Sequence, residues 1–371
     1  MKKKNSLSII FLDFDDIKNP LLGAGQAKAT FEVGSRLVKN GHKVTVISSR
    51  YPSYKDRTQS GIIYKHIGVG STHIKLNNLI YILALPFMVR KVQADIIVEC
   101  FTAPISTMLS PLFTKIPVVG LPTSFEAERF AKLYNLPFDR VEHFGLKRYK
   151  YFLPYTEHFD KKIKKVNKNA VTKIVPEGVG REYFRIKQQK PKHILYLGRL
   201  DIGQKGLDLL LVAYAKVANK IKYPLVLAGH GPDEIKVKDL IKKNKLEKKV
   251  ILVGAVYGTK KEQLLSEAVF AAFPSRHEGF SLVSLEVLAA GLPIVGFNIP
   301  ALSFADKTIS FKAKRFSVSE YANLLLKATD TKTIIPMRKN ARLYVKKYTW
   351  ENVAIQFESF FRQVLKLEKG K

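Results

Sequence analysis

The chain has 371 residues, more than one hydrophobic core usually serves, so we expect two domains. Its hydrophobic content of 46% is typical of a folded protein and excludes a disordered chain. The net charge of +32 is spread over both halves of the sequence and favours anionic partners such as phosphates, acidic lipid or nucleic acid, without selecting one of them.

The cysteine content and the hydropathy of the sequence indicate the cellular compartment in which we expect the protein. The single Cys100 cannot form an intramolecular disulfide, and no cysteine spacing of the zinc-binding type exists, so we expect a reducing, cytoplasmic setting. Only a short apolar run precedes Asp13, and no secretory signal is expected. The longest apolar segment, 79–89, is shorter than the ~20 residues that a spanning helix needs and contains Pro86, so we expect no membrane crossing.

The first half of the sequence alternates apolar runs with helical patterns. Residues 7–13 predict a buried strand, followed by a loop containing GAGQ and a helix on which Val33 and Leu37 share a face. Three further apolar runs predict strands of the same sheet, at 43–48, 94–100 and 116–121. Continuous apolar strands joined through helices are typical of a parallel sheet.

The second half of the sequence repeats this alternation of apolar runs and helical patterns from His193 onward. Apolar runs predict five strands with helices between them, at 193–198, 223–229, 249–256, 268–275 and 292–297. This alternation predicts an α/β protein with two doubly wound parallel-sheet domains. We expect the first domain at 1–170, the second at 171–349, and an amphipathic helix at 350–371 that packs back on the first domain.

Polar residues that directly follow strands of the second domain are the candidate site residues, because ligands of open parallel sheets bind beyond the carboxyl ends of the strands. Three loops qualify: GRLDIGQKG carries Arg199 and Lys205, GHGPD carries His230, and PSRHEGFSL carries Glu278. With two such sheets, we expect the site in the cleft between the domains.

Two glutamates, Glu278 and Glu286, lie eight residues apart in an otherwise small and apolar run. In one helix that spacing corresponds to roughly 12 Å along the axis, which is too far to share one proton or one metal ion. Gly279 disfavours helix at the first glutamate, so we expect Glu278 in a loop and Glu286 in the helix that follows. The amides of residues 279–282 then open a helix and, with the two cations of the first loop, predict an anion site between the carboxylates. This order suits a sugar, a diphosphate and a ribose.

The run EGFSLVSLEVLAAGLPIV, residues 278–295, resembles the E-x7-E motif of retaining GT-B glycosyltransferases, specifically glycosyltransferase family four, also called group 1. The segment LYLGRLDIGQKGLDLLLVAYAKV, residues 195–217, is similar to the family's G-R-L-x-x-x-K-G segment. LAGHGPD at 227–233 resembles its G-x-G-P turn, and VPEGVGREYF at 175–184 resembles its interdomain segment. The resemblance covers nearly the whole chain and is strongest over residues 171–300.

The resemblance implies a GT-B fold, in which two Rossmann-like domains face a central cleft, and a retaining hexosyltransferase. It implies that Arg199 and Lys205 hold the donor diphosphate and stabilise the leaving group. It also implies that Glu278 contacts the transferred sugar near its anomeric centre. The other donor-binding residues that it implies are Gly279, Phe280, Ser281 and Leu282 around the amides, Glu286 at the ribose hydroxyls, and Gly25 at the donor phosphate or the acceptor.

The implied donor is a UDP-, GDP- or similar nucleotide-diphosphate sugar, which serves as co-substrate, and no metal or other cofactor is expected. The implied acceptor is a saccharide or a lipid-linked molecule. We expect a cytoplasmic protein, with peripheral association at the anionic inner face of a membrane kept as an option. Two departures from the family are Ala24 in its first-loop glycine pair and the absence of a histidine around Thr123. The second departure keeps open a GT-B protein that binds a sugar nucleotide without transferring the sugar.

Four features allow other interpretations. Asp13 and Asp15 match a D-x-D metal motif, but we expect strand-end solvation there, and we expect His230 to be structural or to lie near the base. Segment 75–91 is expected to pack as a helix of the first domain, with an interfacial element on an anionic leaflet as the alternative. The charge alone is compatible with a nucleic-acid-binding α/β protein, but that interpretation gives Glu278 and Glu286 no purpose, so nucleic acid is not an expected partner.

Overall fold

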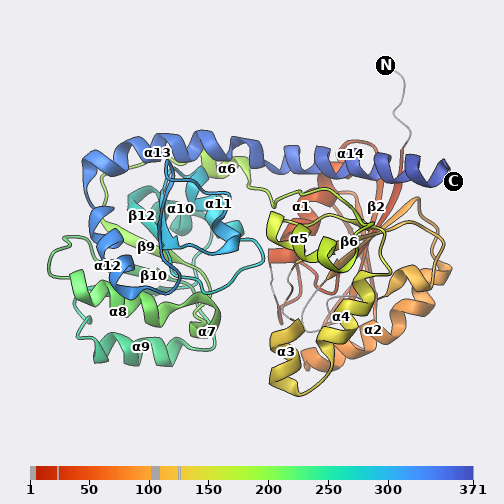
Figure 1. The fold of residues 1–371 in the computed structure, drawn as a ribbon, viewed down its shortest axis with the longest axis horizontal. Helices are drawn as coiled ribbons and strands as arrows, with labels where there is room; N and C mark the ends of the chain where they lie inside the picture. The colour runs from red at the N-terminus through yellow and green to blue at the C-terminus, as the bar shows by residue number, and fades with distance from the viewer. Residues whose placement is uncertain (1–5, 23–24, 102–108, 124, 126, 371) are drawn as a thin grey trace. The chain divides into compact units, whose positions relative to one another are not determined.

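The computed structural model describes residues 6–22, 25–101, 109–123, 125 and 127–370. The chain forms two compact units, Met1–Glu177 with Trp350–Lys371, and Gly178–Thr349. Each unit has one β-sheet accompanied by helices (Figure 1). The fold is therefore of the two-domain α/β type that the alternating pattern predicts.

The first unit contains an eight-stranded sheet in the order β3-β4-β2-β1-β5-β6-β7-β8. Neighbouring strands are parallel except for the antiparallel pair of β3 and β4. The chain thus winds outward from β1 in one direction and then in the other, which defines a doubly wound sheet. The strands are β1 Ser8–Leu12, β2 Lys43–Ser49, β3 Arg57–Gln59, β4 Ile62–Ile67, β5 Ile96–Phe101, β6 Val118–Pro122, β7 Tyr151–Phe152 and β8 Val171–Thr172.

The helices of the first unit are α1 Gly25–Lys39, α2 Ile74–Lys91, the 3-10 turn η1 Ser110–Leu112, α3 Ala127–Tyr134, α4 Phe138–Leu146, α5 Glu157–Val166 and α14 Trp350–Lys369. Strand β5 is buried at every residue, as expected for a central parallel strand. The last helix of the chain, α14, lies against α1: Arg36 Nη2 is 2.9 Å from Glu351 Oε1, and Asn40 donates to Glu358 Oε2 at 3.0 Å.

The second unit has a six-stranded sheet in the order β11-β10-β9-β12-β13-β14, and every neighbouring pair is parallel. This is the strand order 3-2-1-4-5-6 of a dinucleotide-binding sheet. The strands are β9 His193–Leu197, β10 Leu225–Ala228, β11 Val250–Gly254, β12 Ala268–Phe273, β13 Ile294–Phe297 and β14 Ser310–Ala313. The helices are α6 Arg181–Phe184, α7 Ile202–Lys205, α8 Leu207–Val217, α9 Glu234–Lys243, α10 Gly258–Glu267, α11 Leu282–Ala289, η2 Pro300–Leu302, α12 Val318–Lys327, α13 Thr331–Val345 and η3 Lys346–Tyr348.

The boundary between the units differs from the predicted one. The prediction placed residues 171–177 in the second domain, whereas the units divide after Glu177. The reason is that β8, at Val171–Thr172, pairs in parallel with β7 and so extends the first sheet by one strand. Residues 350–371 also belong to the first unit.

Segment 75–91 forms helix α2 of the first unit. Tyr81, Leu85 and Val89 on one side of the helix are buried in the core, which confirms a packed helix. The opposite side is exposed and also apolar. Within the described part of the chain, no helix is both long and apolar enough to span a bilayer.

Candidate functional site

Three loops of the second unit, which follow β9, β10 and β12, are held at the carboxyl edge of the sheet. Glycines allow the first two loops to touch: a Cβ on Gly229 would lie 1.8 Å from the Gly198 carbonyl oxygen, and a Cβ on Gly231 would lie 2.5 Å from that of Leu200. The Leu200 amide donates to the His230 carbonyl at 2.9 Å. The backbone of His230 therefore helps to hold the two loops together, which is a structural role.

The first loop carries the two predicted cations. Arg199 is exposed and donates to Gln204 Oε1 at 3.1 Å, so its guanidinium stays accessible. Lys205 ends the short helix α7, and its ammonium group forms an ion pair with the Glu278 carboxylate. Ser275 also donates to Glu278 Oε1, at 2.9 Å. The structure therefore brings Lys205 and Glu278 together, and Glu278 lies in the loop after β12, as predicted.

Arg276, in the third loop, holds the loop of Glu278 against helices α7 and α8. Its guanidinium makes two bonds of 2.7 Å to the Asp208 carboxylate at the start of α8, and one of 2.8 Å to the Ile202 carbonyl in α7. Its amide donates to the Gln204 carbonyl at 2.9 Å. A bidentate arginine–carboxylate pair fixes relative orientation as well as distance. The loop that carries Glu278 is thus fastened to the helix that carries Lys205.

Helix α11 begins directly after the candidate anion site. Ser281 is its N-cap, and the side-chain oxygen accepts from the Ser284 amide at 3.3 Å. Leu282 is the first residue of the helix and Gly279 lies in the preceding loop. Phe280 stacks on Phe304 with ring centroids 5.4 Å apart. The capped helix start and the stacked ring hold the backbone of residues 279–282 in place.

Glu286 lies in α11, as predicted, and is 4% exposed. Its two carboxylate oxygens have different partners: the Tyr183 hydroxyl donates to Oε1 at 2.8 Å, and Lys261 Nζ lies 2.7 Å from Oε2. Lys261 also donates to the Tyr183 hydroxyl at 2.9 Å. Burial, with the nearby Glu286 charge, raises the pKa of Tyr183, which keeps it a donor. The three side chains form a closed triangle that fixes the direction of the carboxylate.

Tyr183 and Lys261 are site residues that the sequence interpretation missed. Tyr183 lies in α6 and Lys261 in α10, so they come from parts of the chain remote from the E-x7-E run. One signal was available for Tyr183, because it lies in the VPEGVGREYF segment that resembles the family. Nothing in the sequence around Lys261, which is one of a pair of adjacent lysines, distinguishes it from a surface cation.

The remaining predicted site residue, Gly25, lies in the first unit. It is exposed and is the first residue of α1. In the segment where the family often has a histidine, the Thr123 hydroxyl donates to the Phe101 carbonyl at the end of β5. Ser124 lies outside the described residues.

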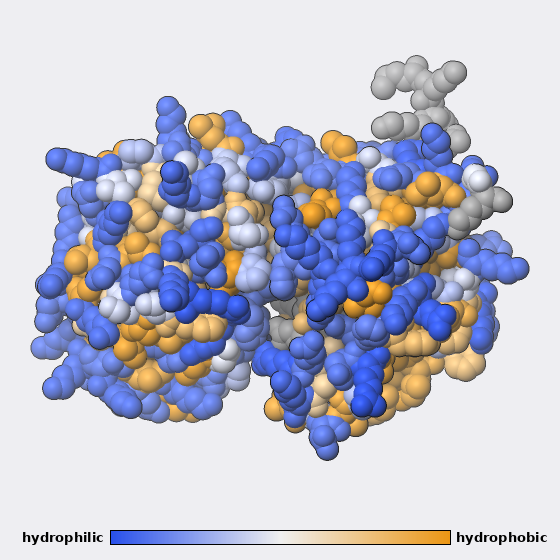
Figure 2. Space-filling model, in the orientation of Figure 1, coloured by the Kyte–Doolittle hydropathy of each residue, from blue (hydrophilic) through white to orange (hydrophobic). Residues whose placement is uncertain are grey.

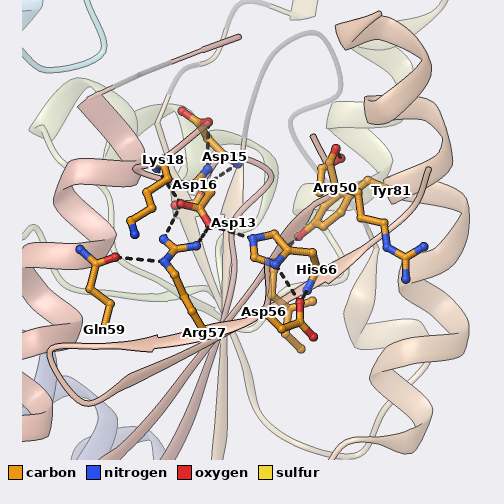
Figure 3. Close-up of polar contacts among 12 residues, drawn as sticks. Asp13, Asp15, Asp16, Lys18, Arg50, Asp56, Arg57, Gln59, His66 and Tyr81 are labelled. Atoms are coloured by element: carbon orange, nitrogen blue, oxygen red, sulfur yellow. Dashed lines mark hydrogen bonds and ion pairs between the residues drawn. The ribbon is translucent and has the colours of Figure 1, made fainter. Parts of the chain in front are cut away.

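The acidic run after β1 is a second polar cluster, also in the first unit (Figure 3). The prediction of strand-end solvation is wrong, because Asp13 and Asp15 are 0% and 4% exposed. Asp13 accepts from the Thr30 hydroxyl at 2.5 Å. Asp16 accepts two bonds of 2.7 Å from Arg57 in β3. The run is therefore internal and fastens the loop after β1 to neighbouring elements.

His66, in β4, lies between two carboxylates of this cluster, as Figure 3 shows. Its Nε2 is 2.8 Å from Asp16 Oδ2, and its Nδ1 is 2.9 Å from Asp56 Oδ1. Among the described residues, no group of three or more His, Cys, Asp or Glu side chains is arranged to hold a metal ion. The contacts identify Asp16 and His66 as a structural link between the β1 loop and the β3–β4 hairpin.

Comparison with protein families matches both units. The model of Glycosyltransferase Family 4 matches residues 23–179, and that of Glycosyl transferases group 1 matches residues 182–304. The chain belongs to glycosyltransferase family four. The second match contains every predicted donor residue except Gly25, and the first match contains Gly25.

Curated relatives of this family four protein include an uncharacterized glycosyltransferase of Methanocaldococcus jannaschii, 27% identical over 48% of this chain and 47% of the relative. A second is the N-acetylgalactosamine-N,N'-diacetylbacillosaminyl-diphospho-undecaprenol 4-alpha-N-acetylgalactosaminyltransferase of Campylobacter jejuni, 37% identical over 32% of this chain and 31% of the relative. The chain thus spans less than half the length of these curated relatives.

Solved structures with the same fold cover nearly the whole family four chain. Sucrose-phosphate synthase from Thermosynechococcus elongatus superposes with a TM-score of 0.80 at 17% identity, covering 97% of this chain and 99% of the other. HepE of Anabaena, in complex with UDP and glucose, superposes with a TM-score of 0.74 at 14% identity, covering 96% and 99%. At these identities the likeness establishes the GT-B fold alone.

Proposed function

We propose that the protein is a retaining glycosyltransferase that moves a sugar from a nucleotide-diphosphate sugar to a saccharide or lipid-linked acceptor. One observation carries this proposal: Lys205 and Glu278 form an ion pair close in sequence to the capped start of α11, and the same helix holds the buried, oriented Glu286. A cation with helix amides suits a diphosphate, and a carboxylate on each side suits the hydroxyls of a sugar and a ribose.

The cations would replace a metal ion at the diphosphate. Arg199 and Lys205 come from one loop, and a diphosphate would compete with Glu278 for the Lys205 ammonium group. Positive charge fixed in advance stabilises the charge that develops on the leaving nucleoside diphosphate. We therefore propose transfer without a metal ion.

The proposed step is a front-face displacement. The bond between the anomeric carbon and the phosphate oxygen breaks, and its electron pair leaves with the diphosphate. The acceptor oxygen bonds to the same face of the carbon, and the acceptor hydroxyl gives its proton to the departing phosphate. Lys205 and Arg199 neutralise that phosphate, while Glu278 orients the sugar hydroxyls. Glu286, held by Tyr183 and Lys261, orients the ribose.

Two of the similar proteins suggest which donor and acceptor classes to test first. HepE, which shares the fold, binds UDP and glucose, and the Campylobacter jejuni relative is named for a diphospho-undecaprenol substrate. We therefore rank UDP first among the candidate nucleotides and keep a lipid-linked acceptor beside a saccharide. A lipid-linked acceptor would require a cytoplasmic enzyme to work at the inner face of a membrane.

Calorimetric titration with UDP, GDP and ADP, without magnesium, tests the donor site. We expect micromolar binding of one nucleotide, weakened in Lys205→Ala and in Glu286→Ala. Lys216→Ala and Glu247→Ala, which change exposed residues of the same unit, serve as matched controls. Equal affinity in all four variants, or no binding of any nucleotide, would contradict the assignment.

A turnover assay separates transfer from binding alone, the alternative that the missing histidine near Thr123 keeps open. We expect release of the nucleoside diphosphate from its sugar in the presence of an acceptor, and retention of the anomeric configuration in the product by NMR. Tight binding of nucleotide sugars with no release across saccharide and lipid-linked acceptors would favour the binding protein.

A further inference from the structure

The outward side of α2 is apolar although it faces solvent. Leu76, Leu79, Leu83 and Phe87 recur at helical spacing along one side, and the last three are 52%, 58% and 66% exposed. The opposite side carries the buried Tyr81, Leu85 and Val89. A helix of a water-soluble protein normally has a polar outer side, so an apolar stripe on both sides indicates that something other than water covers the outer one.

Helix α3 adjoins this surface. Lys75 of α2 lies 5.1 Å from the ring centroid of Tyr134 in α3, which joins the two helices at the surface. We define the apolar face by its exposed residues of α2: Leu76, Leu79, Leu83 and Phe87. Figure 2 shows apolar side chains gathered at the lower right, where α2 lies in Figure 1.

The charge around the apolar face has one dominant sign. Helix α2 has no acidic residue and carries Lys75 near its start and Arg90 and Lys91 at its end. Residues 74–91 and 127–148 together contain eight lysines and arginines against three acidic residues. A cationic border around an apolar stripe complements a surface whose interior is apolar and whose outside is anionic.

We propose that the apolar face docks in the plane of an anionic lipid bilayer, with Leu79, Leu83 and Phe87 entering the boundary between headgroups and acyl chains. Lys75, Arg90 and Lys91 would contact the lipid phosphates. A second copy of this chain is a poorer occupant, because a symmetric contact would bring the same cationic borders against each other. Docking is distinct from the proposed transfer reaction and needs no donor or acceptor, although it suits a lipid-linked acceptor.

Cosedimentation of the full chain with vesicles tests the proposal. We expect binding to phosphatidylcholine vesicles that contain phosphatidylglycerol, and much weaker binding to phosphatidylcholine alone. The double variant Leu83→Gln/Phe87→Gln should lower the partition coefficient by about tenfold or more. Arg90→Gln/Lys91→Gln should lower both the binding and its salt dependence, because exposed charges are screened by salt.

The matched control changes equally exposed apolar residues elsewhere. Ile335 and Leu343 of α13, in the second unit, are 62% and 53% exposed. Ile335→Gln/Leu343→Gln should bind vesicles as the natural protein does. A second readout is Leu83→Trp, whose added fluorescence should shift to the blue on anionic vesicles, while that of Leu343→Trp should not. Trp350, the sole natural tryptophan, is 1% exposed and contributes a constant background.

Two results would overturn the proposal. Vesicle binding that survives Leu83→Gln/Phe87→Gln would show that another surface makes the contact. A dimer detected by light scattering and abolished by the same double variant would assign the apolar face to a second copy. Nucleotide titration without vesicles tests the two proposals separately. The variants of the apolar face should bind nucleotide as the natural protein does. If the natural protein bound no nucleotide, that result would contradict the proposed transfer reaction and leave the docking proposal standing.

Discussion

Glu286 is oriented by side chains that lie outside the motif it belongs to. Tyr183 and Lys261 each contact one of its carboxylate oxygens, from residues 103 and 25 positions away. The two partners hold different oxygens of the carboxylate, so together they fix the direction in which it points. Both bonds end on the charged carboxylate, but only that of Lys261 joins two opposite charges, which makes Lys261 the stronger of the two constraints.

Lys261→Met should weaken nucleotide binding by about tenfold or more, because a hydrogen bond to a charged group is worth roughly 1.5–3 kcal/mol. The substitution keeps the length of the side chain and removes its charge. Lys260→Met is the matched control, since Lys260 is exposed and its ammonium group lies 3.5 Å from the Val253 carbonyl oxygen. Calorimetric titration with the nucleotide that binds measures both. Equal affinities for the two variants would show that Glu286 needs no support from Lys261.

Asp13 and Asp16 are neighbours with opposite pKa shifts. Burial raises the pKa of Asp13 to about 6, against an opposing hydrogen bond from Thr30. Burial also acts to raise the pKa of Asp16, but hydrogen bonds from His66 and Arg57 outweigh it and hold that pKa below the usual range. Asp13 therefore takes up a proton on folding near pH 5, and Asp16 stays ionised.

Asp13→Asn should gain stability relative to the natural protein as the pH rises from about 4 to 7, by roughly 2.4 kcal/mol. Between the usual pKa of 3.8 and the folded value of about 6, the folded state binds more protons than the unfolded state, so the carboxyl form loses stability as the pH rises. Urea unfolding followed by Trp350 fluorescence at the two pH values measures this, because Trp350 belongs to the first unit.

Asp16→Asn provides the contrast in the same experiment. A depressed carboxyl pKa contributes stability that is present above the usual pKa of 3.8 and is lost only as the pH falls below it, so this variant should be destabilised by nearly the same amount at pH 7 and at pH 4. The same pH trend in both variants would contradict the opposite shifts.

At the scale of elements, the turn between α7 and α8 decides where Lys205 points. Gly206 has φ of +65°, a left-handed conformation that ends α7 directly after Lys205. A Cβ at Gly206 would lie 2.2 Å from the Pro274 carbonyl oxygen at the end of β12. The loops that carry Lys205 and Glu278 thus meet at a point where only glycine fits.

Gly206→Ala should therefore destabilise the second unit by roughly 1–3 kcal/mol and weaken nucleotide binding, because both the backbone strain and the clash act at this turn. Gly203→Ala is the control: its Cβ would be 3.6 Å from Asp201 Oδ1, an ordinary contact. Thermal unfolding and nucleotide titration of both variants test the prediction, and equal behaviour of the two would contradict it.

At the scale of the whole molecule, the sequence predicts the fold better than the site. Strands buried on both faces are continuous apolar runs, so the runs at 7–13 and 268–275 predict β1 and β12 within two residues at each end. The β3–β4 hairpin was missed because its strands are short and partly exposed. Its signal is the dipeptide Ser60–Gly61, which has positive φ at both residues and is typical of a tight hairpin turn.

The site was predictable only where it is local in sequence. The motifs place Glu278 in a loop and Glu286 in a helix, because glycine and the apolar helical pattern fix local structure. The partners of Glu286, Tyr183 and Lys261, depend on which elements the fold of the second unit brings together. For Tyr183 the family-like segment was the one available signal. For Lys261 no short segment contains the information, because a lysine on a helix has the pattern of a surface residue until its neighbours are known.

The last helix of the chain, α14, belongs to the first unit and not to the second, which precedes it in sequence. Phe357, Phe360 and Phe361 of α14 are buried there, and Phe361 is 0% exposed. Substitutions near the end of the chain should therefore unfold the part that contains its beginning. Phe361→Ala should lower the free energy of unfolding of the first unit by about 3–5 kcal/mol, through lost burial and the cavity left behind.

Trp350 fluorescence during urea unfolding measures this change in the first unit directly. Ile355→Ala on the same helix is the matched control, because Ile355 is 58% exposed and its truncation should change stability by about 0.5 kcal/mol or less. If Phe361→Ala left the Trp350 transition unchanged, α14 would be an appendage of the first unit. If it shifted that transition alone, the two ends of the chain would share one folding unit, and the second unit between them would unfold separately.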